Sequence, residues 1–117
     1  PLSRQAQAII SDLRAKNGDD RFVLPGRHSR PLSENGPNTA LAAMGYKGLH
    51  TIHGFRTTAV TLLGELGFPR NVVDLQLDHK EENQVRAAYD RSRFLPERRQ
   101  MMQAWADYLD ELREGTV

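Results

Sequence analysis

The spacing of the apolar side chains predicts a chain made mainly of α-helices. Apolar residues recur every three or four positions in three segments, residues 4–17, 52–67 and 96–114. This is the period of an amphipathic helix. Ser3 and Thr51 stand directly before the first two segments, where a short hydroxyl side chain commonly caps a helix. We therefore expect helices that each bury one face.

The side chains expected on those buried faces follow from the same spacing. A helix turns by about 100° per residue, so residues three or four apart lie within one arc. The residues expected to be buried are Ala6, Ile9, Ile10 and Leu13 in the first segment, Phe55, Ala59, Leu62 and Leu66 in the second, and Met101, Trp105, Tyr108 and Leu112 in the third.

Shorter elements are expected between these segments. Residues 33–45 predict a helix with Leu41 and Met44 on its apolar side. Residues 21–24 are a short strand candidate that ends at Pro25. This candidate is the most β-structure that the pattern allows.

A further helix is expected to begin at Pro69 and to end near residue 78. It is apolar nearly all round, so it should be well buried. Its apolar residues are Val72, Val73, Leu75 and Leu77. A polar turn and a short helix with Val85, Ala88 and Tyr89 on one side should follow it.

The composition is that of an ordinary globular protein. At 117 residues the chain fits one domain or a large piece of one. It contains no cysteine, which excludes disulfides and thiolate zinc sites. No apolar run reaches the length of a membrane span, and the first residues lack the pattern of a signal peptide. We expect a cytoplasmic protein with no membrane partner.

The charge is uneven along the chain, although its formal total is only +1. Residues 1–60 hold eight Lys or Arg against four Asp or Glu, which is a net +4. Residues 61–117 hold eight against eleven, which is a net −3. The first half is therefore the better candidate for contacts to phosphates.

His53 and Arg56 lie three residues apart at the start of the helix expected over 52–67, away from its apolar stripe. The first turn of a helix has backbone N–H groups without intrahelical partners, and its dipole favours an anion. A guanidinium can hold two phosphate oxygens at once. The pair is therefore a candidate phosphate site. The alternative is a surface arginine beside a histidine that only satisfies the helix end.

His79 and Tyr89 are further candidates for chemistry. His79 stands at a helix end, where its ring can hydrogen-bond a phosphate, transfer a proton near neutral pH, or only complement the helix dipole. Tyr89 is either a buried tyrosine with a satisfied hydroxyl or a nucleophile. As a nucleophile it would need a neighbouring cation or base, because a free phenol has a pKa of about 10.

The order of these residues resembles that of the tyrosine recombinases, the phage integrase family. A His-x-x-Arg motif comes first, a Leu-x-His motif follows a buried helix, and a tyrosine stands ten residues after that histidine. The resemblance extends to the integrases of prophages and genomic islands and covers nearly the whole chain. The stretches that carry it are PLSRQAQAII, HGFRTTAVTLLGELGF, LDHKEENQVRAAYDR and ERRQMMQAWADYLD.

The resemblance implies a fold, a mechanism and partners. The fold would be the C-terminal portion of the recombinase catalytic domain. Tyr89 would attack a DNA phosphate to give a 3'-phosphotyrosyl link and a free 5'-hydroxyl, without a metal or other cofactor. Arg56 would stabilise charge on the phosphate oxygens, and His53 and His79 would hydrogen-bond them, with His53 handling the tyrosine proton. The partners would be double-stranded attachment sites and further copies of the protein in a synaptic tetramer.

The chain also departs from the family pattern. The family has another catalytic arginine well before His-x-x-Arg, and a lysine on a β-hairpin just before the PLS stretch, and neither has a counterpart here. We therefore interpret residues 1–117 as the C-terminal part of an integrase catalytic domain, without its DNA-arm and core-binding domains. We expect this chain alone not to cleave DNA.

Arg27 and Arg30, in the loop over 26–31, are further candidates for contacts to backbone phosphates.

Two other functions remain open from the residues alone. Residues 57–79 have the helix, glycine turn, helix outline of a helix-turn-helix DNA reader, but the second helix is too apolar for a recognition helix. A metal hydrolase using His50, His53 and His79 is the other alternative, although it lacks a carboxylate ligand at metal spacing.

The terminal helix is expected to pack on its own chain, with exchange onto a neighbouring protomer on DNA.

Overall fold

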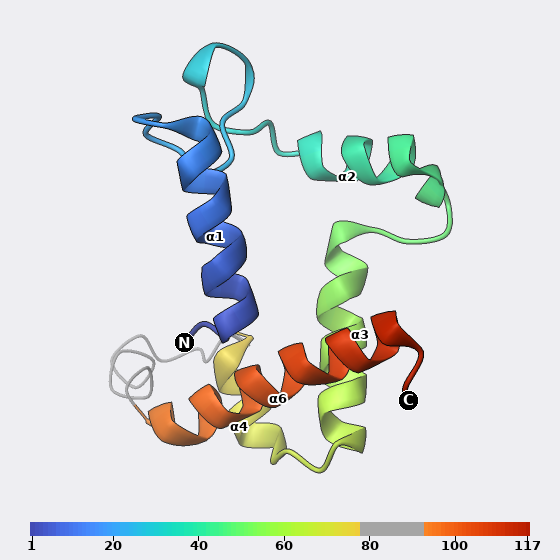
Figure 1. The fold of residues 1–117 in the computed structure, drawn as a ribbon. Coiled ribbons are helices and arrows are strands. Elements are labelled where there is room, and N and C mark those ends of the chain that lie inside the picture. The colour runs from blue at the N-terminus through green and yellow to red at the C-terminus, as the bar shows by residue number, and fades with distance from the viewer. Residues whose placement is uncertain (78–92) are drawn as a thin grey trace, which may run out of the picture. The chain divides into compact units, whose positions relative to one another are not determined.

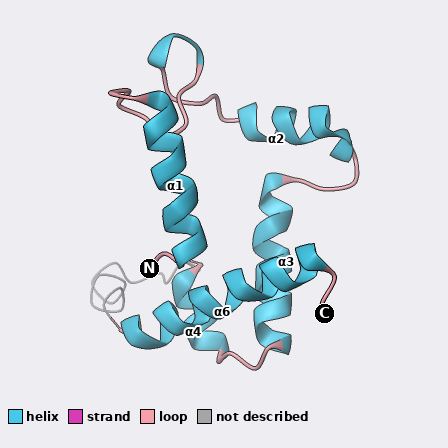
Figure 2. Ribbon diagram, viewed as in Figure 1, coloured by secondary structure: helices cyan, strands magenta, loops and turns pink. Residues whose placement is uncertain are grey.

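The computed structural model describes residues 1–77 and 93–117, and these residues are helices joined by loops (Figures 1 and 2). Within the described ranges there is no strand, and none of the helices is long and apolar enough to cross a membrane. The predicted mainly-α class is confirmed. The elements are α1 (Arg4–Asn17), the 3-10 turn η1 (Arg27–Ser29), α2 (Gly36–Leu41), the π-helical segment η2 (Ala42–Tyr46), α3 (Ile52–Glu65), α4 (Arg70–Gln76) and α6 (Leu95–Glu114).

The long helices begin and end at residues that favour helix termini. The Ser3 hydroxyl accepts a hydrogen bond from the backbone N–H of Ala6 at 3.2 Å, so it caps α1. Gly18 follows α1 with a φ of 57°, and Gly115 follows α6 with a φ of 70°. Glycine adopts such positive φ values without the strain that a Cβ would cause, which is why it often ends a helix.

The chain divides into two compact units. One unit consists of Pro1–Ala6 and Thr58–Val117, and the other is Gln7–Thr57. The boundaries fall inside α1 and α3, so each of these helices contributes residues to both units. The core described next belongs to the first unit, and the candidate site belongs to the second.

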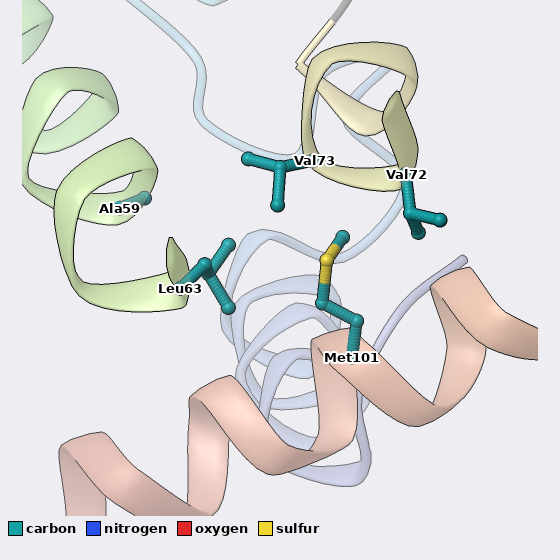
Figure 3. Packing of buried hydrophobic residues seen from close by; sticks show 5 residues of the cluster. All are labelled: Ala59, Leu63, Val72, Val73 and Met101. Atoms are coloured by element: carbon teal, nitrogen blue, oxygen red, sulfur yellow. The ribbon is translucent and has the colours of Figure 1, made fainter. Parts of the chain in front are cut away.

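The core of the first unit is made by the second half of α3 together with α4 and α6. Leu63, Val73 and Met101 are its most deeply buried side chains, each at most 1% exposed. Figure 3 shows Met101 reaching from α6 toward the two valines of α4, with Leu63 of α3 beside it. Trp105, one turn along α6 from Met101, packs against the same cluster. The terminal helix therefore packs on its own chain, as predicted.

The buried face of α3 differs from the predicted one. Ala59 is buried as expected, but Phe55 and Leu66 are 54% and 42% exposed, and Leu63 is buried in their place. Val60, which lies outside the predicted apolar face, packs against the core. Phe55 is exposed because only the part of α3 from Thr58 onward belongs to the unit that contains this core. Leu66 lies past the end of α3 at Glu65, so it does not follow the helical spacing.

The predicted apolar faces of α1 and α6 are also only partly correct. Ile9 is 60% exposed and no residue of α1 is fully buried. At the far end of α6, Leu112 is 46% exposed. From residue 7 onward α1 belongs to the second unit, in which Leu41 is the one buried apolar side chain among the described residues. That unit therefore has almost no buried core on which α1 could pack, and several of its large apolar side chains stay exposed.

A polar network joins the start of α1 to α6 within the first unit. The Gln5 side-chain amide donates to Asp107 at 2.8 Å and to Asp110 at 2.9 Å. Gln103 donates to Asp107 at 2.8 Å, and the Arg4 guanidinium lies 3.7 Å from the same carboxylate. Hydrogen bonds from Gln5 and Gln103, with the charge of Arg4, lower the pKa of Asp107 below its ordinary value. The network therefore favours the ionised carboxylate.

This network predicts a specific acid sensitivity. Because the pKa of Asp107 is lower in the folded chain, its ionised form adds stability above the ordinary carboxyl pKa of about 4. That contribution is lost as the pH falls through the lower, folded value. We expect Asp107→Asn to flatten the acid limb of a plot of unfolding free energy against pH. The control is Asp12→Asn, at an exposed position in α1, and equal flattening by both variants would contradict the prediction.

The second unit differs most from the sequence-based expectation. The strand predicted over residues 21–24 is wrong, because this stretch is a series of bends. Its backbone is held by side chains instead: the Asn17 amide donates to the carbonyl of Val23 at 2.6 Å, and the N–H of Phe22 donates to Asp20 at 2.9 Å. A strand needs a neighbour to pair with, and the described residues provide none.

The helix predicted over residues 33–45 begins later and buries less than expected. α2 starts at Gly36, with Pro37 in its first turn, where the missing N–H of proline is harmless. Leu41 is buried as predicted, but Met44 is 71% exposed. Met44 lies in η2, the π-helical continuation of α2, whose wider turn changes which residues share a face.

Candidate functional site

The start of α3 is fixed by two side-chain caps. The Thr51 hydroxyl accepts a hydrogen bond from the N–H of Gly54 at 3.1 Å, which confirms the predicted cap. The Asn38 side-chain oxygen, from α2, accepts a hydrogen bond from the N–H of Ile52 at 2.9 Å. Together they hold the first turn of α3 in place relative to α2.

These caps change how the helix start can hold an anion. The predicted Thr51 cap occupies the N–H of Gly54, and the unexpected contact with Asn38 occupies that of Ile52, so neither N–H is free for an anion. The helix dipole remains, but a phosphate here would depend mainly on side-chain donors. The two candidate donors are His53 and Arg56.

His53 and Arg56 lie on neighbouring turns of α3, at the i and i+3 positions that face the same side of a helix. His53 is exposed and Arg56 is half-buried. Among the residues that the structure describes, neither has a hydrogen-bond or ion-pair partner. A histidine and a guanidinium without competing protein partners can both donate to an anion.

The imidazole of His50 packs against the first turn of α3. Its ring lies 4.5 Å from the ring of Phe55, centre to centre, in an edge-to-face arrangement. A Cβ added at Gly54 would come within 2.8 Å of the His50 ring, so the missing side chain makes room for the histidine. From the sequence, His50 is a candidate metal ligand only, and its contact with Phe55 is not predicted. The available signal is Gly54, a residue without a side chain four positions after His50.

Metal binding finds no support in the described part of the chain. Within residues 1–77 and 93–117, no three His, Cys, Asp or Glu side chains are grouped so that they could hold a metal ion. His50 is packed against Phe55 instead.

His79 and Tyr89, the remaining predicted catalytic residues, lie outside the described residues, as does the short helix expected around Val85 and Ala88. Arg27 and Arg30 lie in the second unit, at η1 and directly after it, and both side chains are exposed. The described structure therefore places His53 beside Arg56, and Arg27 beside Arg30. It leaves the relation of His79 and Tyr89 to these pairs as a prediction.

A comparison with protein families identifies the chain. A sequence model of the phage integrase family matches residues 1–95, which include His53, Arg56, His79 and Tyr89. The chain belongs to the phage integrase family. The resemblance inferred from the motifs is thereby confirmed, and the mainly helical structure agrees with it.

Individual integrases match the chain over nearly its whole length. The integrase of Enterobacteria phage P4 is 48% identical over 116 residues, which cover 94% of this chain and 26% of that protein. Prophage integrase IntA of Escherichia coli strain K12 is 39% identical, over 100% of this chain and 29% of its own length. The chain thus spans between a quarter and a third of these integrases. No solved structure matches it.

The fold weighs against the helix-turn-helix alternative. In that alternative α4 would be the recognition helix, which needs exposed polar side chains to reach base edges. Val72 and Val73 of α4 are instead 3% and 1% exposed, and they form part of the core. α4 is thus a structural helix of the integrase fold.

Proposed function

We propose that this chain supplies part of the active site of a site-specific DNA recombinase that integrates a phage or genomic island. Membership of the integrase family and the pairing of exposed His53 with half-buried Arg56 on α3 support this proposal. The substrate is double-stranded attachment-site DNA, and the recombining assembly contains several copies of the protein, as a synaptic tetramer. Its place of action is the bacterial nucleoid.

The reaction that we propose is a transesterification at a DNA phosphate. The Tyr89 oxygen attacks phosphorus, a 3'-phosphotyrosyl bond forms, and the bond from phosphorus to the 5' oxygen breaks. The phenolic proton passes to a base, for which His53 is the candidate, and the leaving 5' oxygen takes up a proton as a hydroxyl. The number of phosphoester bonds is unchanged, so rejoining needs neither a metal nor a nucleotide.

Charge stabilisation is the proposed role of the other residues. Negative charge builds on the non-bridging oxygens as the tyrosine attacks, and fixed donors aimed at those oxygens stabilise the transition state. Arg56 provides a charged donor that two caps hold at the start of α3. His79 is proposed to hydrogen-bond the same phosphate, and Arg27 and Arg30 to contact the DNA backbone.

We further propose that residues 1–117 act as the C-terminal portion of the catalytic domain. The sequence holds no counterpart of the family's upstream catalytic arginine and lysine. Without them, charge stabilisation and protonation of the leaving group are incomplete. Cleavage would then require the residues that longer integrases supply.

The observation that carries the proposal is the His53 and Arg56 pair in a chain of this family, and the test is covalent trapping. A longer integrase carrying this chain is incubated with a nicked attachment-site substrate, and the covalent protein–DNA adduct is measured. We expect an adduct that Tyr89→Phe abolishes, because phenylalanine has no oxygen to attack with. Tyr108→Phe, in α6, is the matched control and should leave the adduct unchanged.

Two outcomes would contradict the proposal. An undiminished adduct in Tyr89→Phe would show that another residue is the nucleophile. A Tyr89-dependent adduct formed by residues 1–117 alone would show that the upstream arginine and lysine are dispensable.

A further inference from the structure

The loop between α1 and α2 contains a solvent-open hollow of about 650 Å³ whose charged lining is entirely basic. The lining residues are Pro25, Gly26, Arg27, Arg30, Pro31, Leu32 and Ser33. The only ionisable groups among them are the two guanidiniums, so a charged ligand in the hollow would be an anion and not a cation.

The backbone of this loop is tightly closed. The N–H of Gly26 donates to the carbonyl of Arg30 at 2.7 Å, and the N–H of Arg30 donates to the carbonyl of Arg27 at 3.3 Å. A turn closed in this way brings its end residues within about 7 Å of each other. The two arginines therefore start from neighbouring points on one rim of the hollow.

Gly26 is required by that closure. A Cβ added at Gly26 would lie 2.7 Å from the carbonyl oxygen of Pro31 and 3.1 Å from that of Arg30. Both contacts are with backbone, which cannot move aside as a flexible side chain can. Any larger residue would force the rim open and separate the two arginines.

Asp20 lies just before the loop and is itself held by hydrogen bonds. Its carboxylate accepts one from the N–H of Phe22 at 2.9 Å, and its backbone carbonyl accepts one from the Arg14 guanidinium at 2.8 Å. Hydrogen bonding from Phe22 and Ser29, together with the charge of Arg14, lowers the pKa of the Asp20 carboxyl. Ser29 and His28 both have a φ of 55°, a strained backbone that persists only where surrounding contacts maintain it.

Neither arginine is neutralised by the protein. Among the described residues, Arg27 and Arg30 have no ion-pair or hydrogen-bond partner for their guanidiniums, and both are exposed. Arg70 and Arg113, in contrast, pair with carboxylates on their own helices. Two unpaired guanidiniums held on one small turn repel each other, and a shared anion would remove that repulsion.

We propose that the Arg27 and Arg30 turn, shaped by Gly26, is a preformed seat for a single phosphodiester of duplex DNA away from the bond that is cut. The inference rests on the proposed function, because it assigns this loop a second phosphate on the same DNA. Contacts to backbone phosphates position a protein on DNA without reading its sequence. The seat would thus fix how the duplex lies on the Gln7–Thr57 unit.

The test measures DNA affinity of the 117-residue chain by fluorescence anisotropy, using a 20-base-pair duplex between about 50 and 200 mM salt. We expect Arg27→Gln and Arg30→Gln each to lower the DNA affinity by a factor of about three to ten. Each should also lower the slope of log affinity against log salt by about one. Because both arginines hold one phosphate, the double variant should lower the slope by about one as well, not by two.

Two matched controls separate a shaped seat from general positive charge. Arg21→Gln removes an equal charge from an exposed arginine of the same unit that lies over the Phe22 ring, and we expect little change in the salt slope. Gly26→Ala keeps all charges but should lower affinity as the arginine variants do. Gly64→Ala, where a Cβ meets only open space, should not, and circular dichroism should show equal helix content in all variants.

Four results would overturn the proposed phosphate seat. The wild-type chain could fail to bind the duplex, or Arg21→Gln could lower the affinity and the salt slope as much as Arg27→Gln does. The double variant could lower the salt slope by about two, or Gly26→Ala could bind DNA with the wild-type affinity. Inorganic phosphate could change the NMR chemical shifts of Arg27 and Arg30 while the variants leave the DNA affinity unchanged. That result would show an anion site that has no role in DNA binding. Loss of the Tyr89 adduct with loop-dependent binding intact would instead overturn only the proposed reaction.

Discussion

Replacing Arg56 with glutamine is expected to lower the rate of covalent DNA cleavage by a factor of about 100 to 1,000. The measurement is adduct formation under single-turnover conditions, in a longer integrase carrying this chain. Glutamine keeps a hydrogen-bond donor of similar shape but removes the charge, so it isolates the electrostatic role. The loss should appear in the rate of the chemical step more than in DNA affinity, because the phosphate gains a second negative charge in the transition state and Arg56 offsets that additional charge.

Arg56→Lys should recover only part of that rate. Lysine keeps the positive charge but not the planar fork with which arginine holds two oxygens at once. The order of rates expected is therefore arginine, then lysine, then glutamine.

The control for these variants is Arg113→Gln. Arg113 is a 74% exposed arginine near the end of α6 that pairs with Asp110 and Glu114, so its loss removes an equal charge far from the proposed chemistry in sequence. Because Arg56 has no partner within the described residues, its replacement should leave the unfolding free energy nearly unchanged. Equal cleavage rates in Arg56→Gln and wild type would exclude Arg56 from the active site.

Met101→Ala is expected to lower the free energy of unfolding by about 2 to 5 kcal/mol. Met101 is completely buried where α6 meets α4, so its removal loses apolar burial and leaves a cavity lined by Leu63 and the valines of α4 (Figure 3). Small domains are stable by only about 5 to 15 kcal/mol. A single substitution of this kind therefore removes a large share of the stability of this unit.

The measurement is urea unfolding followed by the fluorescence of Trp105, the only tryptophan of the chain, which packs against this core. Met44→Ala is the matched control, since that methionine is 71% exposed and surface substitutions usually change stability by less than about 0.5 kcal/mol. If both methionine variants unfolded at the same urea concentration, Met101 would not be part of the core.

The candidate site was predictable from sequence to the extent that its chemistry is local. His53 and Arg56 were expected on one side of a helix capped by Thr51, and the structure confirms this cap and their position on α3. The second cap could not be predicted, because Asn38 lies fourteen residues before Ile52 in the sequence and only the fold of the second unit brings it there. His79 and Tyr89 remain predictions.

The sequence by itself determined the helices of α1, α3, α4 and α6, the caps of α1 and α3 at Ser3 and Thr51, the absence of disulfides and the family motif. These features depend on neighbours within a few positions, so they can be read along the chain. Only the tertiary structure decided which faces became buried: Leu63 in place of Phe55, Met101 at the centre, and bends in place of a strand over residues 21–24. It also decided that Gly26 shapes the loop of Arg27 and Arg30. Burial and strand pairing depend on residues distant in sequence, and a local pattern carries no information about which of them will meet.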